Sequence, residues 1–186
     1  MTPQTLDRST AVRHALRTLV AQHGFHGASM SAVAAEAGVA TGTAYTHYAS
    51  KDELVLAAYL ETKTELGAAA TAGVDPSDPP AERFQSIWMA TYRHLAANSE
   101  HALFLLQVDC SPYKQEAHQA AMAGDGDPLQ EAASAADLAG LLLPLPLEVT
   151  YELGLGPAVR LAAGGLTLAD KDLEAIAAAC WRAISR

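Results

Sequence analysis

The segment from Ser29 to Glu53, SMSAVAAEAGVATGTAYTHYASKDE, constrains the fold of this chain most. Ser29 is a helix-capping residue that precedes a short run with helical apolar spacing, and Gly38 supplies the backbone freedom to end that helix. A second short helix is expected over residues 41–48. Ser50 and Glu53 then form a capping box, which starts a longer helix. The segment therefore predicts two short helices around a tight turn, followed directly by a third helix.

The second short helix carries hydroxyl, imidazole and phenol groups on the side that must be exposed. Packing alone does not require such a surface. A helix-turn-helix unit places its second helix in the major groove of DNA, with short hydrogen-bonding side chains near the start of that helix. Lys51 and the free amides that begin the next helix suit a phosphate group. The residues that fit the groove-facing role are Thr41, Gly42, Thr43, Tyr45 and His47.

This run resembles the DNA-binding domain of TetR-family transcriptional regulators, because the order and spacing of its residues and its flanking helices agree with the pattern of that family. The resemblance implies a DNA-binding domain over residues 1–50 and a helical domain for ligand binding and dimerisation over residues 51–186. Two departures, Ala40 in place of a capping serine and Thr41 in place of a lysine, weaken the expected grip on DNA but not the fold. The matching positions are Gly38-Val39, Gly42-Thr43, Tyr45, His47-Tyr48, Ser50-Lys51 and Leu54.

The resemblance also implies roles for single residues. Thr43 and Tyr45 are expected at the groove, His47 and Lys51 at phosphates, and Ser29 or Ser31 adds a contact from the first helix of the unit. A capping or core role is the alternative for His47. No arginine stands on the second helix to bind guanine in bidentate fashion, so direct base recognition is the least defined part of this interpretation.

The net charge is unevenly divided along the chain. All 186 residues together carry −9, which argues against a nucleic-acid partner. Residues 1–51, however, carry four basic and two acidic side chains, whereas residues 52–186 carry a net −11. This asymmetry favours one end that faces phosphate. With so few cations, DNA affinity should depend on amides, hydroxyls and dimer formation, and its salt dependence should be modest.

The composition argues against a membrane-spanning or secreted protein and against a disulfide or metal site. No apolar run approaches the roughly 20 residues of a membrane span, and the first ten residues lack the apolar centre of a signal peptide, so we expect a cytoplasmic protein without a membrane partner. Cys110 and Cys180 lie in helical patterns without metal-type spacing, which predicts two buried free thiols and no disulfide. Asp109, Glu116 and His118 form a weak metal-site alternative. We expect no metal and no cofactor.

The patterns predict an all-α chain of about nine helices. Aspartates and prolines in GDGDP, residues 124–128, favour a helix start with Asp127 as the capping residue over a calcium loop. Glycines and Pro157 predict a kink in one late helix. Outside the helix-turn-helix segment, the expected helices cover residues 6–23, 51–70, 81–97, 100–110, 112–123, 128–143, 147–163 and 170–185.

Two further sets of residues are candidates for function in the helical domain. One set combines aromatic and polar side chains that would line a mostly apolar ligand cavity if their helices converge, and a filled core is the alternative: Trp88, Tyr92, Phe104, Gln107, Asp109, Tyr113 and His118. The other set forms apolar stripes on the last two helices. These stripes predict a four-helix bundle across a two-fold axis, with the core of the single subunit as the alternative: Tyr151, Leu155, Val159, Ile176, Cys180, Trp181 and Ile184.

The mechanism that the resemblance implies is a homodimeric repressor, which binds a palindromic double-stranded DNA operator and is released by a small-molecule effector. Two other classes compete with it. An enzyme would need a pair such as Cys110 with His118, or Asp109 with His101, but neither pair has a third member or an oxyanion device. The acidic charge and the departures at Ala40 and Thr41 favour a second rival, a helical ligand-binding protein that has lost its DNA contacts.

Overall fold

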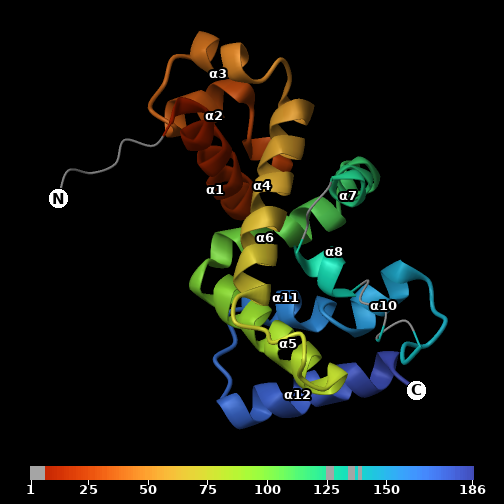
Figure 1. Ribbon diagram of the computed structural model, residues 1–186. Helices are drawn as coiled ribbons and strands as arrows, with labels where there is room; N and C mark the ends of the chain where they lie inside the picture. The colour runs from red at the N-terminus through yellow and green to blue at the C-terminus, as the bar shows by residue number, and fades with distance from the viewer. Residues whose placement is uncertain (1–6, 125–127, 134–136, 138–139) are drawn as a thin grey trace. The chain divides into compact units, whose positions relative to one another are not determined.

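The computed structural model describes residues 7–124, 128–133, 137 and 140–186, and every regular element of this described part is a helix (Figure 1). The all-α prediction is therefore confirmed. The chain forms two compact units. Unit 1 comprises Met1–Thr62 and Leu103–Ala123, and unit 2 comprises Lys63–Ala102 and Gly124–Arg186. This division differs from the predicted boundary at residue 51, because part of the second half of the chain packs with the N-terminal helices.

Three helices begin unit 1: α1 (Arg8–Gly27), α2 (Met30–Glu36) and α3 (Thr41–His47). Each of the three contacts the other two. The apolar positions predicted along α1 are buried, with Val12, Leu16 and Val20 fully covered. Gly24 has the left-handed φ of 66° that ends the regular part of α1, as its position as a helix stop predicted.

Helix α4 (Lys51–Thr71) starts where the capping box predicts. The Ser50 hydroxyl accepts a hydrogen bond from the Glu53 amide at 3.1 Å, and the Glu53 carboxylate accepts one from the Ala49 amide at 2.8 Å. Unit 1 also contains α7 (Lys114–Ala123), which begins two residues later than predicted because the Ser111 hydroxyl accepts from the Tyr113 amide in a preceding turn. Helices α4 and α6 (Ser99–Asp109) each contribute residues to both units.

A buried ion cluster joins α1 to α4 within unit 1. Arg13 and Arg17 each donate to one carboxylate oxygen of Glu61, at 2.6 and 2.5 Å, and Arg13 also donates to the Tyr48 hydroxyl. The side chains of Arg13, Arg17 and Glu61 are 19%, 5% and 20% exposed. Arg13 and Arg17 are two of the four basic side chains of residues 1–51, the end of the chain that was expected to face phosphate. That expectation is wrong for these two arginines, because both are paired with the Glu61 carboxylate inside the unit.

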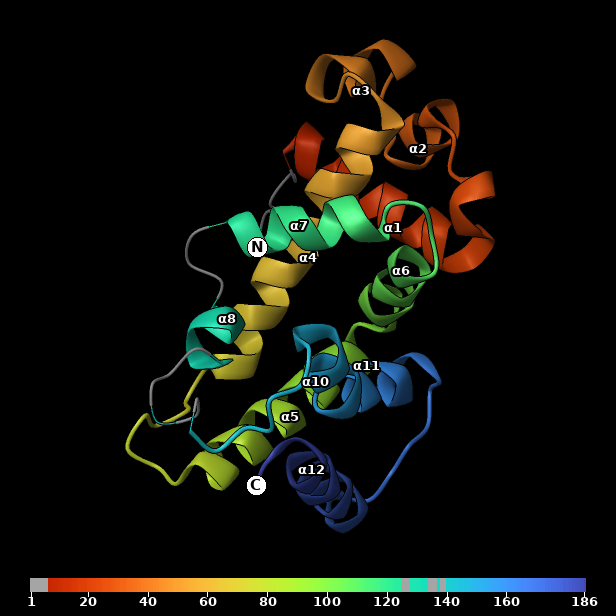
Figure 2. The same cartoon turned by 90° about the vertical axis from the view of Figure 1, so that its right-hand side faces the viewer.

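Unit 2 is built around α5 (Pro80–Ala97), which lies between α11 (Gly156–Ala163) and α12 (Asp170–Ile184) in Figure 2. Helix α10 (Leu147–Leu153) contacts α11 and α12. Helix α8 (Pro128–Ala133) precedes α10 in the sequence. Trp88 of α5 is fully buried and donates from its indole nitrogen to the Gly154 carbonyl at 3.2 Å. Burial of large apolar side chains such as Trp88 and Leu173 supplies the main stabilisation of this packing.

Two predicted helices differ from the structure. The helix expected over 128–143 does not reach Leu143, because Leu142 forms an isolated antiparallel bridge with Ser185. The helix expected over 147–163 is divided into α10 and α11 at Gly154, where a Cβ atom would lie 2.8 Å from the Thr150 carbonyl oxygen. The predicted interruption by glycine and proline is thus correct in place but larger than a kink. The expected capping residue Asp127 lies outside the described residues.

The two cysteines occupy different environments. Both are free thiols, but Cys110 is exposed at the end of α6 and Cys180 is buried in α12. The prediction of two buried thiols is therefore wrong for Cys110. Burial raises the pKa of the Cys180 thiol. Over the described residues, no helix is both long enough and apolar enough to cross a membrane.

Candidate nucleic-acid interface and cavity

The turn between α2 and α3 is set by local backbone chemistry. Ser29 caps α2, since its hydroxyl accepts from the Ala32 amide at 3.2 Å. Gly38 takes a left-handed φ of 67°, and the Val39 amide then donates back to the Ala34 carbonyl at 2.9 Å. These contacts fix the direction in which α3 leaves the turn. The two helices therefore form the compact pair that the sequence predicted.

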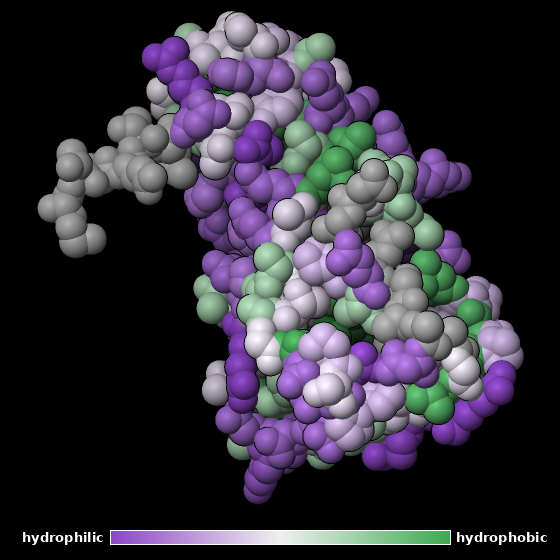
Figure 3. All heavy atoms as spheres, in the orientation of Figure 1, coloured by the Kyte–Doolittle hydropathy of each residue, from purple (hydrophilic) through white to green (hydrophobic). Residues whose placement is uncertain are grey.

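Helix α3 buries one narrow side and exposes the rest. Ala44 is fully buried, whereas the Tyr45 side chain is 51% exposed. Thr43 is half-buried. Figure 3 shows pale and purple surface over α2 and α3, with little strongly hydrophobic surface. The other exposed residues of this helix are Thr41, Gly42, Thr46 and His47.

Gly42 adds a second feature to this surface. A Cβ atom at this position would meet nothing within 4 Å, and the backbone there is ordinary helix. Glycine disfavours a helix by about 1 kcal/mol relative to alanine, so the fold of this chain gives no reason for it. Removing the side chain lets another molecule approach the backbone of α3 closely. The backbone of α3 is therefore open to solvent at Gly42.

Cations are scarce at this surface. Residues 29–50 contain no lysine or arginine. Lys51, expected at a phosphate, donates from Nζ to the Phe25 carbonyl and lies 5.8 Å from the centre of the Phe25 ring. Burial lowers the pKa of Lys51, and only the nearby Asp52 opposes this effect. The ammonium group thus uses one of its three N–H donors to cap the end of α1.

The other residues that the sequence predicted to contact DNA expose their polar groups to solvent. The Ser29 and Ser31 hydroxyls lie 3.0 Å apart at the start of α2, and both residues are exposed. His47 is exposed at the end of α3, with its ring 6.5 Å from that of Tyr48. Its exposure argues against the core alternative. The surface of α2 and α3 is therefore polar but nearly uncharged, and hydroxyls and backbone amides are its main donors.

The seven residues predicted to line a ligand cavity do not form one group. Trp88 and Tyr92 belong to unit 2, where Tyr92 is buried and donates to the Leu166 carbonyl at 2.7 Å. The other five belong to unit 1. Phe104 is fully buried, Gln107 is exposed, and Tyr113 donates to Asp52 at 2.9 Å. Packing or internal hydrogen bonds account for six of these side chains, the exposed Gln107 excepted, and none of the seven lines the cavity found in unit 2.

His118 and Asp109 are joined by a hydrogen bond within unit 1. Nε2 of His118 lies 2.8 Å from a carboxylate oxygen of Asp109, and the His118 ring stacks on Tyr59 at 6.0 Å. This contact fixes one ring nitrogen of the histidine on the aspartate. Within the described ranges, no group of three or more His, Cys, Asp or Glu side chains has an arrangement that suits a metal.

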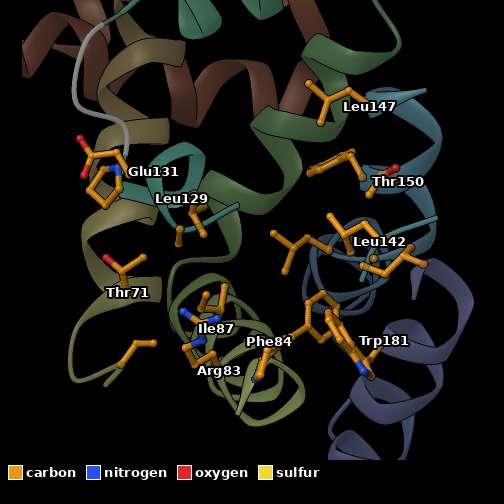
Figure 4. A pocket seen from close by; sticks show the side chains of 18 of the residues that line it. Thr71, Arg83, Phe84, Ile87, Leu129, Glu131, Leu142, Leu147, Thr150 and Trp181 are labelled. Atoms are coloured by element: carbon orange, nitrogen blue, oxygen red, sulfur yellow. The ribbon is translucent and has the colours of Figure 1, made fainter. Parts of the chain in front are cut away.

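Unit 2 contains a cavity of about 470 Å³, shown in Figure 4. Its residues come from the end of α4 and the following loop, from α5, α8, α10 and α12, and from the segment around Leu142. Most are apolar, and two, Arg83 and Glu131, carry charge. None of these residues, Arg83 included, is among the seven that the sequence predicted for a ligand cavity. The available signal was the i, i+4 spacing of Arg83 and Ile87, which places both on one face of α5.

The residues predicted for a dimer surface are only partly available to a second copy. Val159, Cys180 and Ile184 are 2%, 7% and 4% exposed, so the structure corrects their assignment and places them in the core of unit 2. The other four are partly exposed: Tyr151, Leu155, Ile176 and Trp181. Three of these, Tyr151, Leu155 and Trp181, also line the cavity.

The three-helix arrangement of unit 1 and its polar exposed helix define a helix-turn-helix DNA-binding protein. Residues 12–58 match the sequence profile of bacterial regulatory proteins of the tetR family, and residues 79–185 match that of the tetracyclin repressor-like C-terminal domain. The chain belongs to the TetR family of transcriptional regulators. It is accordingly a DNA-binding regulator of transcription, as the sequence predicted.

Similar proteins extend over nearly the whole chain. An HTH-type transcriptional regulator of Haemophilus influenzae is 26% identical over an alignment of 184 residues, and the match covers 97% of each chain. A crystal structure of a TetR-family regulator from Haemophilus influenzae, also 26% identical, superposes with a TM-score of 0.79 and covers 97% of both chains. One from Shewanella sp. PV-4 is 25% identical with a TM-score of 0.81, covering 97% of this chain and 99% of the other.

Proposed function

We propose that the protein is a homodimeric repressor of a palindromic operator, released when a small apolar or amphipathic ligand occupies the cavity of unit 2. The exposed polar surface of α3 carries the DNA-binding part of this proposal. Ala44 holds α3 against its own unit, while Tyr45 and the neighbouring hydroxyls face outward. Gly42 leaves the backbone of α3 open to close approach. A surface of this kind suits the major groove.

A dimer is supported by apolar side chains that unit 2 leaves uncovered. Helix α10 has no buried residue, and its apolar side chains Leu147, Val149 and Leu153 are 60%, 41% and 41% exposed. Ile176 and Trp181 of α12 are also partly exposed. A second copy would cover such side chains in a symmetric interface. Two copies would present two α3 helices to one face of DNA, which fits an inverted-repeat operator.

The dimer can be tested by charge substitution on α10. The double variant Val149→Glu/Leu153→Glu should sediment as a monomer at concentrations where the unaltered protein is a dimer. Leu166→Glu is the matched control, since Leu166 is 55% exposed but lies outside α10 and α12. A double variant that stays dimeric would exclude α10 from the interface.

Release requires that ligand binding in unit 2 changes the DNA affinity of unit 1. Helix α4 is a continuous connection, because its first part belongs to unit 1 while Thr71 at its other end lines the cavity. A ligand that binds better to one orientation of α4 would shift the population toward that orientation. A coupling of about 1 to 3 kcal/mol changes DNA affinity by about 5- to 150-fold, which is enough for a switch.

The DNA-binding role is tested with Tyr45→Ala and a fragment of promoter DNA from upstream of the protein's own gene. The variant should bind this DNA at least about tenfold more weakly in fluorescence anisotropy, because it loses the largest exposed side chain of α3. Its urea unfolding curve should be unchanged. Tyr45→Phe keeps the ring and therefore separates the contribution of the hydroxyl from that of apolar contact.

A helical ligand-binding protein that has lost its DNA contacts is the second candidate, favoured by the absence of lysine and arginine from residues 29–50. The two candidates differ at low salt. A regulator should retard its promoter fragment at low and moderate salt, with a shallow slope of log affinity against log salt, because it neutralises few phosphates. A folded dimer that retards no DNA at low salt would decide for the second candidate.

A further inference from the structure

The cavity of unit 2 has an apolar wall with a single buried charge. Its volume of about 470 Å³ lies in the ordinary range for small-molecule sites. The hydroxyls of Thr71 and Thr150 already donate to backbone carbonyls one turn earlier in their helices. Of the two charged residues at the wall, Glu131 is exposed, whereas Arg83 is only 9% exposed. Arg83 therefore dominates the charge inside the cavity.

The guanidinium of Arg83 is incompletely paired. One terminal nitrogen donates to Asp137, but the buried Nε–H finds no acceptor among the residues that the structure describes. A buried donor without an acceptor costs free energy, so it usually has a partner. The Nε atoms of Arg13 and Arg17 in unit 1 also lack one, yet neither residue lines this cavity. Figure 4 shows Arg83 on the same wall as Phe84 and Ile87, all three from α5.

The partner of Arg83 is replaceable. The Asp137 side chain is 52% exposed, so water would solvate its carboxylate if Arg83 changed partner. An incoming carboxylate would exchange one counter-ion for another, so the guanidinium of Arg83 would stay paired while Asp137 returns to water. Guanidinium groups bind carboxylates through two parallel N–H donors, a geometry that the terminal nitrogens alone or together with Nε can supply.

We infer that this cavity binds an apolar molecule with one carboxylate, which Arg83 holds while the rest of the molecule lies among the apolar side chains. The inference rests on the proposal that this cavity is the effector site, and it adds the chemical class of the effector. A carboxylate gives the Nε–H of Arg83 an acceptor and replaces Asp137 as its counter-ion. An alcohol of the same chain length would leave Arg83 paired with Asp137, and an ammonium group would be repelled.

Three probes with the same alkyl chain test this inference: decanoate, decanol and decyltrimethylammonium. Their binding to the full-length protein is measured by calorimetry, without DNA and below the concentrations at which they self-associate. Fluorescence of Trp181, whose ring packs 5.4 Å from that of Phe84 at the cavity wall, reports on occupancy. Decanoate should bind about tenfold or more tightly than decanol, and decyltrimethylammonium should bind most weakly.

Substitutions then assign the selectivity to Arg83. Arg83→Gln should weaken decanoate binding by about 10- to 100-fold, the range for a hydrogen bond to a charged group, and leave decanol binding within about twofold. Retained decanol binding also shows that the cavity is still folded. Arg93→Gln is the matched control, because Arg93 is on the same helix and pairs with Asp170 outside the cavity. Asp137→Asn should instead tighten decanoate binding, since it removes the competing carboxylate.

Several outcomes would overturn the inference. They are equal binding of decanol and decanoate, tighter binding of the cation, unchanged decanoate binding in Arg83→Gln, and no binding of any probe. Adding promoter DNA afterwards separates the two proposals. If decanoate binds through Arg83 but leaves DNA affinity unchanged, the ligand class holds and the release mechanism fails. If no DNA binds even without ligand, the regulatory proposal fails independently of the result for Arg83.

Discussion

Unit 1 and unit 2 each contain arginine side chains with little exposure, but the carboxylates that pair with these arginines differ in their exposure to solvent. In unit 1, Arg13 and Arg17 share the two carboxylate oxygens of Glu61, and all three side chains are at most 20% exposed. In unit 2, Arg83 pairs with the exposed Asp137 at the wall of a cavity. A closed cluster fixes one helix against another, whereas an open pair can exchange its anion. The arginines of unit 1 therefore hold two helices together, whereas Arg83 of unit 2 lies where the proposed ligand could reach it.

The largest loss of stability should come from removing the Glu61 carboxylate from the ion cluster in unit 1. Glu61→Gln leaves two buried guanidinium groups without a carboxylate, so the free energy of unfolding in urea should fall by about 3 kcal/mol. Glu65→Gln is the control on the same helix, because Glu65 is 44% exposed and should change this free energy by less than about 0.5 kcal/mol. A loss in Glu61→Gln as small as in the control would mean that the cluster is not structural.

The pH dependence of stability should report the same cluster. Burial raises the pKa of Glu61, but hydrogen bonds and charge from Arg17 and Arg13 outweigh it and place the pKa below its usual value of 4.5. Because the pKa of the folded state lies below that of the unfolded state, the cluster stabilises the protein above about pH 4.5 and this contribution is lost as the pH falls through the folded pKa. The difference between the unaltered protein and Glu61→Gln in urea unfolding should therefore shrink on acidification. A difference that stays constant into acid would contradict this.

Removing the charge of Arg83 in unit 2 should lower the free energy of unfolding much less. Arg83→Gln leaves behind Asp137, which is 52% exposed and readily hydrated, so the free energy of unfolding should fall by about 1 kcal/mol or less. The asymmetry arises because the abandoned partner is solvated in unit 2 but buried in unit 1. Equal losses in Arg83→Gln and Glu61→Gln, measured in urea under the same conditions, would remove the contrast between the two units.

The smallest effect on stability is expected at Gly42, and it should have the opposite sign. Gly42→Ala should stabilise the fold by up to about 1 kcal/mol, because alanine favours a helix and its Cβ meets no atom. The same Cβ should weaken binding to promoter DNA if the backbone of α3 lies close to the duplex. Ala40→Gly, next to the start of α3, is a control for changes in loop flexibility. Stabilisation with unchanged DNA affinity would show that Gly42 does not lie at the interface.

The sequence predicts this fold well where the signals are local. Ser29 and Gly38 act on neighbouring backbone groups, and the pair Ser50 and Glu53 caps its own helix, so short-range chemistry settles each of these boundaries. Helical periodicity likewise identifies the buried side of α5, with Trp88, Leu95 and their neighbours. These signals state which residues are inside, and the structure agrees with them.

The candidate sites depend on contacts between distant residues, and periodicity does not specify these. Arg13 and Glu61 are 48 positions apart, and Phe84 meets Trp181 from another helix. The set around Trp88 and Phe104 is defined by residue type, and its members, apart from the exposed Gln107, are packed or hydrogen-bonded within their own units instead. The cavity was missed for the same reason, because Leu142 and Leu147 have no helical pattern that connects them with Arg83. Contacts between residues far apart in the sequence are visible only in the three-dimensional structure.

The position of Cys110 offers a direct route to following the switch in solution. It is exposed in unit 1, while burial disfavours the reactive thiolate of Cys180, so a maleimide dye should attach selectively at one place. Both tryptophans of the chain, Trp88 and Trp181, lie in unit 2. Energy transfer from indole to a dye on Cys110 would thus register any rearrangement of one unit against the other as ligand is added. The chain already carries this donor and acceptor site without engineering.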